Sequence, residues 1–63
     1  MYMPLRLTYT TPLNILENIK IGDLISDIYQ MMGKVIKIEK ITLRTNIQFI
    51  FTLDNYESIL ILR

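Results

Sequence analysis

The sequence contains only two glycines, Gly22 and Gly33, and the interpretation of the residues between them decides the fold. Asp23 could cap a helix over 23–32 that ends at Gly33, because aspartate is a common N-cap and glycine a common terminator. A turn at Gly22-Asp23 could instead lead into an extended segment from Leu24 to Tyr29, followed by a loop. Isoleucine, serine and aspartate are mediocre helix formers. Periodicity alone is compatible with both interpretations.

A chain of 63 residues makes one small domain, 1–63, and 51% of these residues are hydrophobic. Such a domain buries only ~60% of its unfolded surface, so a high apolar content is needed for folding. The same content argues against disorder. No apolar run approaches the ~20 residues of a membrane span, and the first residues lack the features of a signal peptide. We therefore expect a cytoplasmic protein that is not inserted in a membrane.

The sequence lacks histidine and cysteine. The commonest general base and metal ligand is therefore missing, and neither disulfides nor thiolate chemistry can occur. The carboxylates are scattered, and a domain of this size offers little room for a pocket. We expect a protein that is not an enzyme and that holds no cofactor and no metal.

The N-terminal region predicts a strand and one helical turn. Apolar and polar residues alternate over 3–9, which is typical of a half-buried strand. Thr11-Pro12 suits a helix N-cap followed by the first helical position. The segment 13–18 is therefore expected to form a short turn that directs Leu13 and Leu16 inward.

The C-terminal half predicts three strands. Branched residues dominate from Lys34 to Leu43, with a change of alternation at Glu39-Lys40 that indicates a bulge or bend. Residues 47–53 alternate with period two, and a last strand follows the polar break at 54–58. An odd-length loop there predicts that Phe51 and Phe49 approach Ile59 and Ile61.

The register of the first hairpin follows from where the apolar side chains fall. A two-residue turn at Thr45-Asn46 would place Phe51 opposite Lys40, so that a charged residue would lie on the apolar face. A three-residue loop over 44–46 sets Leu43 against Ile47 and Ile41 against Phe49, with Asn46 in the left-handed conformation. We predict the second register.

Three short motifs resemble Src-homology-3-like small barrels of the KOW type. They are the run 19–25 (Ile-Lys-Ile-Gly-Asp-Leu-Ile), the run 33–38 (Gly-Lys-Val-Ile-Lys-Ile) and the run 54–57 (Asp-Asn-Tyr-Glu), where Tyr56 replaces the usual glycine. The resemblance implies an all-β barrel of about five strands with a strongly bent strand near Glu39. The alternative is an α+β fold with a helix over 23–32 on a three- or four-stranded antiparallel sheet.

Two surfaces are candidates for binding. Residues 34–44 carry a net charge of +3, and the rest of the chain sums to −2. This asymmetry suggests a basic hairpin that contacts the phosphates of nucleic acid or of a nucleoprotein, with a tyrosine nearby for stacking. A solvated lysine-rich strand face that discourages edge pairing explains the same charges. The candidate residues are Lys34, Lys37, Lys40, Arg44 and Tyr29.

The second candidate surface lies on the last strand, which is apolar on both sides. Leu60 and Leu62 point away from Ile59 and Ile61, and Ile50 shares their side. Either another part of the chain covers Ile50, Leu60 and Leu62, or a second copy does, most simply as a two-fold homodimer. The alternative function is thus a protein-interaction subunit that homo-oligomerises. An accessory protein of a phage or mobile element would suit this character.

Overall fold

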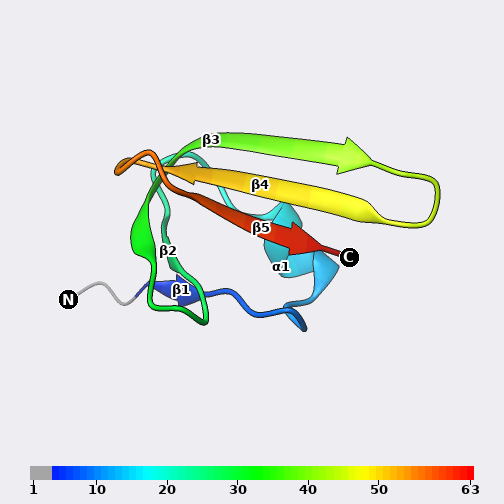
Figure 1. The fold of residues 1–63 in the computed structure, drawn as a ribbon, viewed down its shortest axis with the longest axis horizontal. Coiled ribbons are helices and arrows are strands. Elements are labelled where there is room, and N and C mark those ends of the chain that lie inside the picture. The colour runs from blue at the N-terminus through cyan, green and yellow to red at the C-terminus, as the bar shows by residue number, and fades with distance from the viewer. Residues whose placement is uncertain (1–3) are drawn as a thin grey trace.

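The computed structural model describes residues 4–63 and shows an all-β domain with one short helix (Figure 1). The elements are β1 Leu5–Arg6, α1 Leu13–Glu17, β2 Leu24–Ser26, β3 Met32–Thr42, β4 Ile47–Leu53 and β5 Ser58–Leu62. The strands form one five-stranded sheet in the order β1-β2-β3-β4-β5. β1 pairs with β2 in parallel, and all other pairs are antiparallel. The all-β prediction with about five strands is confirmed.

The helix considered for 23–32 is wrong, because the two aspartates of this region use their side chains to build turns. Asp23 Oδ2 accepts a hydrogen bond from Lys20 N at 2.8 Å, next to Gly22, whose φ is +97°. Asp27 Oδ1 accepts from the backbone N–H groups of Tyr29 and Met31. Such contacts offer the backbone an alternative to helical hydrogen bonds. Only the short strand β2 lies between the two turns.

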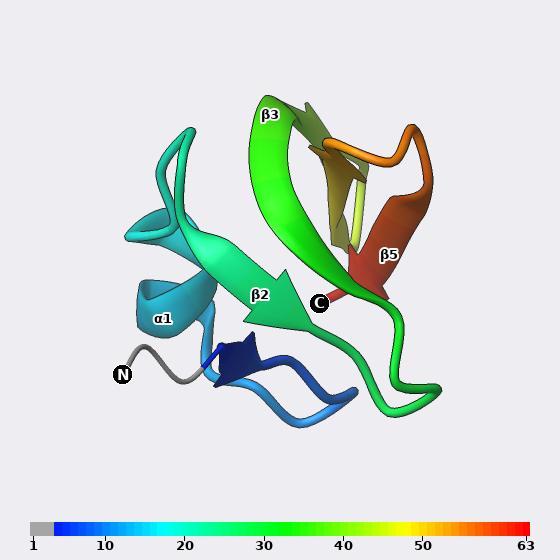
Figure 2. The same ribbon diagram turned by 90° about the vertical axis from the view of Figure 1, so that its left-hand side faces the viewer.

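The long strand β3 connects the two parts of the sheet. Its first residues, 32–34, pair with β2, and residues 35–42 pair with β4. The strand curves strongly along its length (Figure 2). The register shifts between Val35 and Lys37, so the bulge lies a few residues before the predicted position at Glu39-Lys40. The bulge adds one residue to β3 and so changes its alternation. As a result, the side chains of both Val35 and Ile38 face the core.

The predicted register of the β3–β4 hairpin is wrong. Lys40, not Ile41, lies opposite Phe49, and Leu43 N donates to Asn46 O at 2.7 Å around a turn at 44–45. Asn46 is not left-handed. The Lys40 ammonium lies 5.8 Å from the centre of the Phe49 ring, where its charge is attracted by the π-face. Lys40 is therefore accommodated beside the core. The expected penalty for placing a lysine on the apolar face of β3 does not arise.

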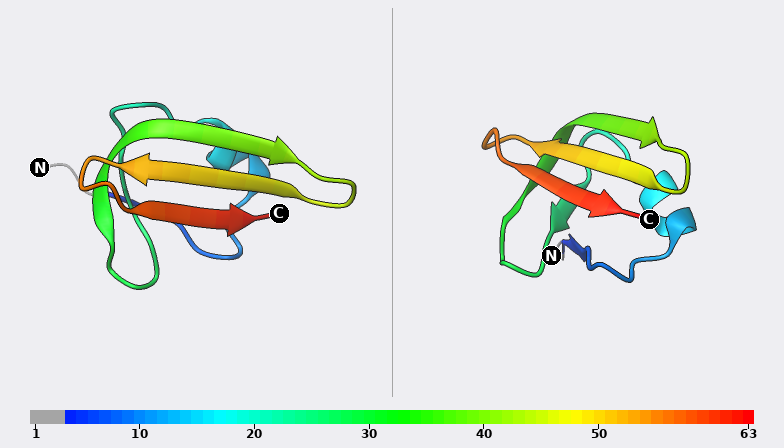
Figure 3. Two further views of the ribbon diagram at one scale, coloured as in Figure 1. Left: turned by 45° about the horizontal axis from the view of Figure 1, so that its top comes forward. Right: turned by 45° about the vertical axis from the view of Figure 1, so that its right-hand side comes forward.

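The core lies between the β3–β4–β5 part of the sheet and the N-terminal half of the chain (Figure 3). Phe51 pairs with Ile59 and Phe49 with Ile61, as the odd-length loop predicts. The two phenylalanine rings stack with centroids 5.9 Å apart. The buried apolar residues are Leu7, Leu16, Ile19, Ile25, Val35, Phe49, Phe51, Leu53, Ile59 and Ile61.

The N-terminal segment is less regular than its sequence predicts. β1 is short, and only Leu7 of the alternating residues in the described region is buried; Met3 lies outside that region. The Thr11 hydroxyl accepts a hydrogen bond from Thr8 N within a turn, and Pro12, not Thr11 as predicted, occupies the N-cap position of α1. Leu16 is buried as predicted, whereas the prediction that Leu13 points inward is wrong, because its side chain is exposed.

The turn between β4 and β5 places a bulky residue in the left-handed region. Tyr56 has φ 65°, and its side chain is 86% exposed, so packing of the ring contributes little to stability. This conformation costs an L-residue about 1–2 kcal/mol, and the greater unfolded-state entropy of glycine offsets part of that. We expect Tyr56→Gly to raise the free energy of unfolding by about 0.5–1 kcal/mol in urea denaturation. Tyr56→Ala, which keeps the Cβ atom, is the control; a glycine variant no more stable than the alanine variant would contradict the strain.

Candidate functional site

The outward face of the β3–β4–β5 sheet carries a row of apolar side chains. Ile50 of β4 lies opposite Leu60 of β5, and Gln48 lies between Ile41 of β3 and Leu62 of β5. Leu60 and Leu62 are each 53% exposed, and Ile41 is 39% exposed. We call these four residues, Ile41, Ile50, Leu60 and Leu62, the outer face. The structure brings together the three interface residues predicted from sequence and adds Ile41, which the wrong hairpin register had turned inward.

The four basic residues predicted to bind nucleic acid do not form one cluster. Lys34 lies near the start of β3 and Arg44 just beyond its end, separated by ~33 Å of chain measured along an extended strand. Lys37 lies opposite Thr52 and pairs with Glu39 across 3.5 Å. Arg44 is exposed at the tip of the hairpin, which projects beyond the rest of the fold (Figure 1).

Lys40 lies on the other side of the sheet from Lys37. Its ammonium is 2.7 Å from Glu17 Oε2 in the helix α1. Both side chains are about two-fifths exposed, so the pair contributes only ~0.2–1 kcal/mol to stability. Lys40 therefore joins the hairpin to α1. It lies on the core side of the sheet and is not part of the outer face.

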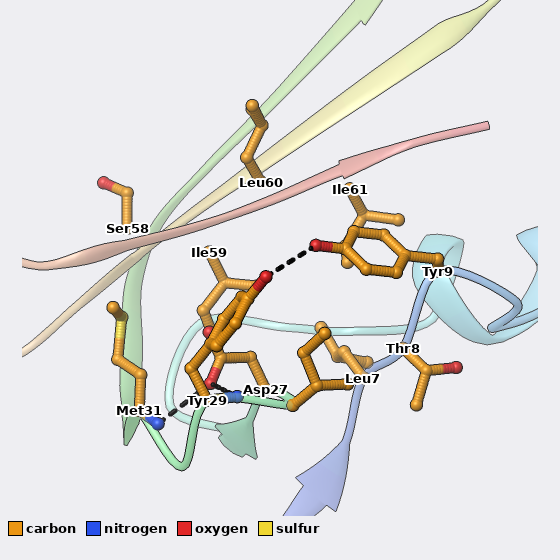
Figure 4. A pocket seen from close by; sticks show the side chains of 11 residues that line it. Leu7, Thr8, Tyr9, Asp27, Tyr29, Met31, Ser58, Ile59, Leu60 and Ile61 are labelled. Carbon is orange, nitrogen blue, oxygen red and sulfur yellow. Dashed lines mark hydrogen bonds between the residues drawn. The ribbon is translucent and has the colours of Figure 1, made fainter.

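Tyr29 lies in the loop between β2 and β3, at the other end of the molecule from the hairpin tip. Its hydroxyl is 3.2 Å from the hydroxyl of Tyr9, and the two side chains point toward each other beside β5 (Figure 4). The hydrogen bond to Tyr29, together with the charges of Tyr29 and Asp27, raises the pKa of Tyr9. The structure thus groups Tyr29 with Tyr9 and β5, and not with the basic residues.

A groove of about 380 Å³ lies beneath these two rings. It runs between β5 and the segments 7–9 and 27–31, and its walls include Leu7, Met31 and Ile59 (Figure 4). The Arg63 guanidinium donates a hydrogen bond to Tyr9 O at 3.0 Å. β1 and β5 are the two edge strands of the sheet, and they do not pair with each other in the described region. The groove lies along the β5 edge.

The free edge of β5 follows from the hydrogen-bond pattern. Ile47 and Arg63 exchange both backbone hydrogen bonds, and opposed residues of an antiparallel pair alternate between bonded and non-bonded pairs. Ile59 and Ile61 are therefore bonded to β4. The backbone groups of Ser58, Leu60 and Leu62 point to the opposite side, where no strand of residues 4–63 pairs with them. Sequence alone could not reveal this edge, because it depends on which strand ends the sheet.

No family model, curated protein or solved structure matches this chain. Within residues 4–63, no helix has the length and apolar character of a membrane span. The same residues contain no group of three or more acidic side chains close enough to hold a metal ion. The arrangement of the outer face and of the β5 edge is accordingly the basis for a functional assignment.

Proposed function

We propose that this chain is a small non-enzymatic interaction module that homo-oligomerises through β5 and the outer face beside it. The observation that carries the proposal is the position of Ile50, Leu60 and Leu62 on one solvent-facing side of the sheet. Full burial of a leucine is worth about 1.5–3 kcal/mol, so covering the exposed half of Leu60 and Leu62 favours association by roughly 1 kcal/mol each. Ile50 and Leu60 lie directly opposite each other on this side, and exposed apolar side chains grouped in this way commonly mark a protein contact.

The test is the oligomeric state in solution. We expect wild-type protein to sediment as a dimer at tens of micromolar concentration and Leu60→Lys to sediment as a monomer, because the charge would have to be desolvated in the contact. Ile21→Lys is the matched control, since Ile21 is 68% exposed in a turn away from the outer face. A monomeric wild type, or equal dissociation of both variants, would refute the proposal.

Nucleic-acid binding is the second candidate function, favoured by the exposure of Lys34, Lys37 and Arg44 outside the core. If these three residues contact phosphates, the affinity for a DNA or RNA oligonucleotide should fall roughly 40-fold between 50 and 200 mM salt, through release of counterions. Arg44→Gln should weaken binding, whereas Lys40→Gln should not, because Lys40 lies on the core side of the sheet, where Glu17 engages it. An oligonucleotide that fails to bind at low salt would exclude this candidate.

The resemblance to Src-homology-3-like barrels is part of the same proposal. The strong curvature of β3 supports it, since the resemblance implies one sharply bent strand. The φ of 65° at Tyr56 also supports it, because that is the position where the pattern has glycine.

A further inference from the structure

The two edges of the sheet differ in how well they are protected against pairing with another chain. β1 is only two residues long and follows Pro4, and very short strands and prolines are common means of protecting an edge. β5 has five residues, Ser58 to Leu62, with no proline, no charge and no bulge in its pairing with β4. Its outward backbone groups have no strand partner in residues 4–63. β5 is therefore the less protected of the two edges.

The order of residues along β5 is self-complementary when a second copy runs antiparallel to it. If Leu60 lies on the two-fold axis, Leu60 faces Leu60 of the second copy and Ser58 faces Leu62. These are the residues whose backbone groups point outward, so each facing pair can exchange both hydrogen bonds. In the same register Arg63 faces Glu57 of the second copy, at both ends of the contact.

The charges select this register among those that the backbone permits. A shift by two residues in one direction would place Arg63 opposite Asn55 of the second copy, and in the other direction opposite Ile59. Only the register centred on Leu60 opposes unlike charges and overlaps the two β5 strands over their full length. Opposite charges across neighbouring strands stabilise the pair, whereas like charges destabilise it.

We propose that two copies of this chain form a two-fold dimer by antiparallel pairing of their β5 edges, with Leu60 on the axis and Arg63 facing Glu57 of the second copy. This inference rests on the homo-oligomerisation proposed above and specifies its geometry. The β3–β4–β5 sheets of the two copies then form one continuous sheet. Ile50 and Leu60 of one copy and the same residues of the second copy form a single apolar row across it.

The first test is amide hydrogen exchange at two protein concentrations. Backbone N–H groups of Leu60 and Leu62 should become at least tenfold slower to exchange when the concentration is raised from mostly monomer to mostly dimer, as determined by sedimentation. Ile59 and Ile61, which are bonded to β4 in each copy, are the internal control and should be slow at both concentrations. Self-association without protection at Leu60 and Leu62 would overturn the edge pairing and leave the proposed function standing. A chain that does not self-associate would overturn both.

The second test exchanges the facing charges. Glu57→Arg and Arg63→Glu should each weaken dimerisation about tenfold, because each places like charges opposite one another at both ends. The double variant Glu57→Arg with Arg63→Glu should return the dissociation constant to within about threefold of the wild type. The double variant does not restore the hydrogen bond from Arg63 to Tyr9 O, so recovery of dimerisation reports the contact between copies and not that internal bond. Additive weakening in the double variant would overturn the register.

Discussion

Phe51→Ala is expected to remove a large part of the free energy of unfolding. Phe51 is fully buried, lies near the centre of β4 and stacks on Phe49. Replacing a buried phenylalanine with alanine costs about 3–5 kcal/mol. Stability typically amounts to about 0.05–0.15 kcal/mol per residue, which gives ~3–9 kcal/mol for a chain of this length. The loss therefore equals a large part of the whole, and far-ultraviolet circular dichroism during a urea titration should show it.

Ile50→Ala is the matched control, because Ile50 is the next residue on the same strand and points to the outer face. It is only partly buried, and alanine should cost about 1 kcal/mol or less of the free energy of unfolding. The two variants should be compared at a concentration where the protein is monomeric, because loss of a dimer contact would add to the measured destabilisation. Equal destabilisation by the two variants would show that both faces of β4 are covered within one copy.

The alternation of residues predicts which side chains of a strand share a face, and the structure confirms this for Phe49, Phe51, Ile59 and Ile61. Alternation does not determine which residue of the neighbouring strand lies opposite. The choice between the β3–β4 registers depended on excluding a lysine from the core side. Lys40 stays there because it reaches both the Phe49 ring and Glu17, a residue 23 positions away. Such a distant partner is not visible in a local pattern.

The same reasoning explains what sequence revealed of the candidate surfaces. Ile50, Leu60 and Leu62 were found because period two along single strands assigns them to one side. Ile41 was missed because its side depends on the β3 bulge and on the hairpin register. The proximity of Tyr9 and Tyr29 could not be anticipated, since it arises from turns built by the Asp27 side chain and by Thr8 and Thr11. Tertiary contacts, not local propensity, decide these positions.

Gly33→Ala is expected to be the second most destabilising of these changes, at about 1–3 kcal/mol. Gly33 is buried where β3 leaves β2 and passes the end of β4. A Cβ atom at this position would lie 2.7 Å from Asp54 Oδ1 and 3.1 Å from Leu53 Cβ. The first contact requires the carboxylate to move, and the second involves an atom fixed to the backbone. Urea denaturation of the variant measures the cost.

A double-mutant cycle with Asp54→Ala tests whether the carboxylate causes this loss. Asp54 Oδ1 also accepts a hydrogen bond from Lys34 N at 3.3 Å, so Asp54→Ala alone should be mildly destabilising. In its presence, Gly33→Ala should cost at least about 0.5 kcal/mol less than in the wild type, because one of the two close contacts is gone. The remaining cost reports the contact with Leu53. If Gly33→Ala costs the same in both backgrounds, the carboxylate is not the cause of the destabilisation. Glycine would then be required at position 33 because β3 packs closely against Leu53.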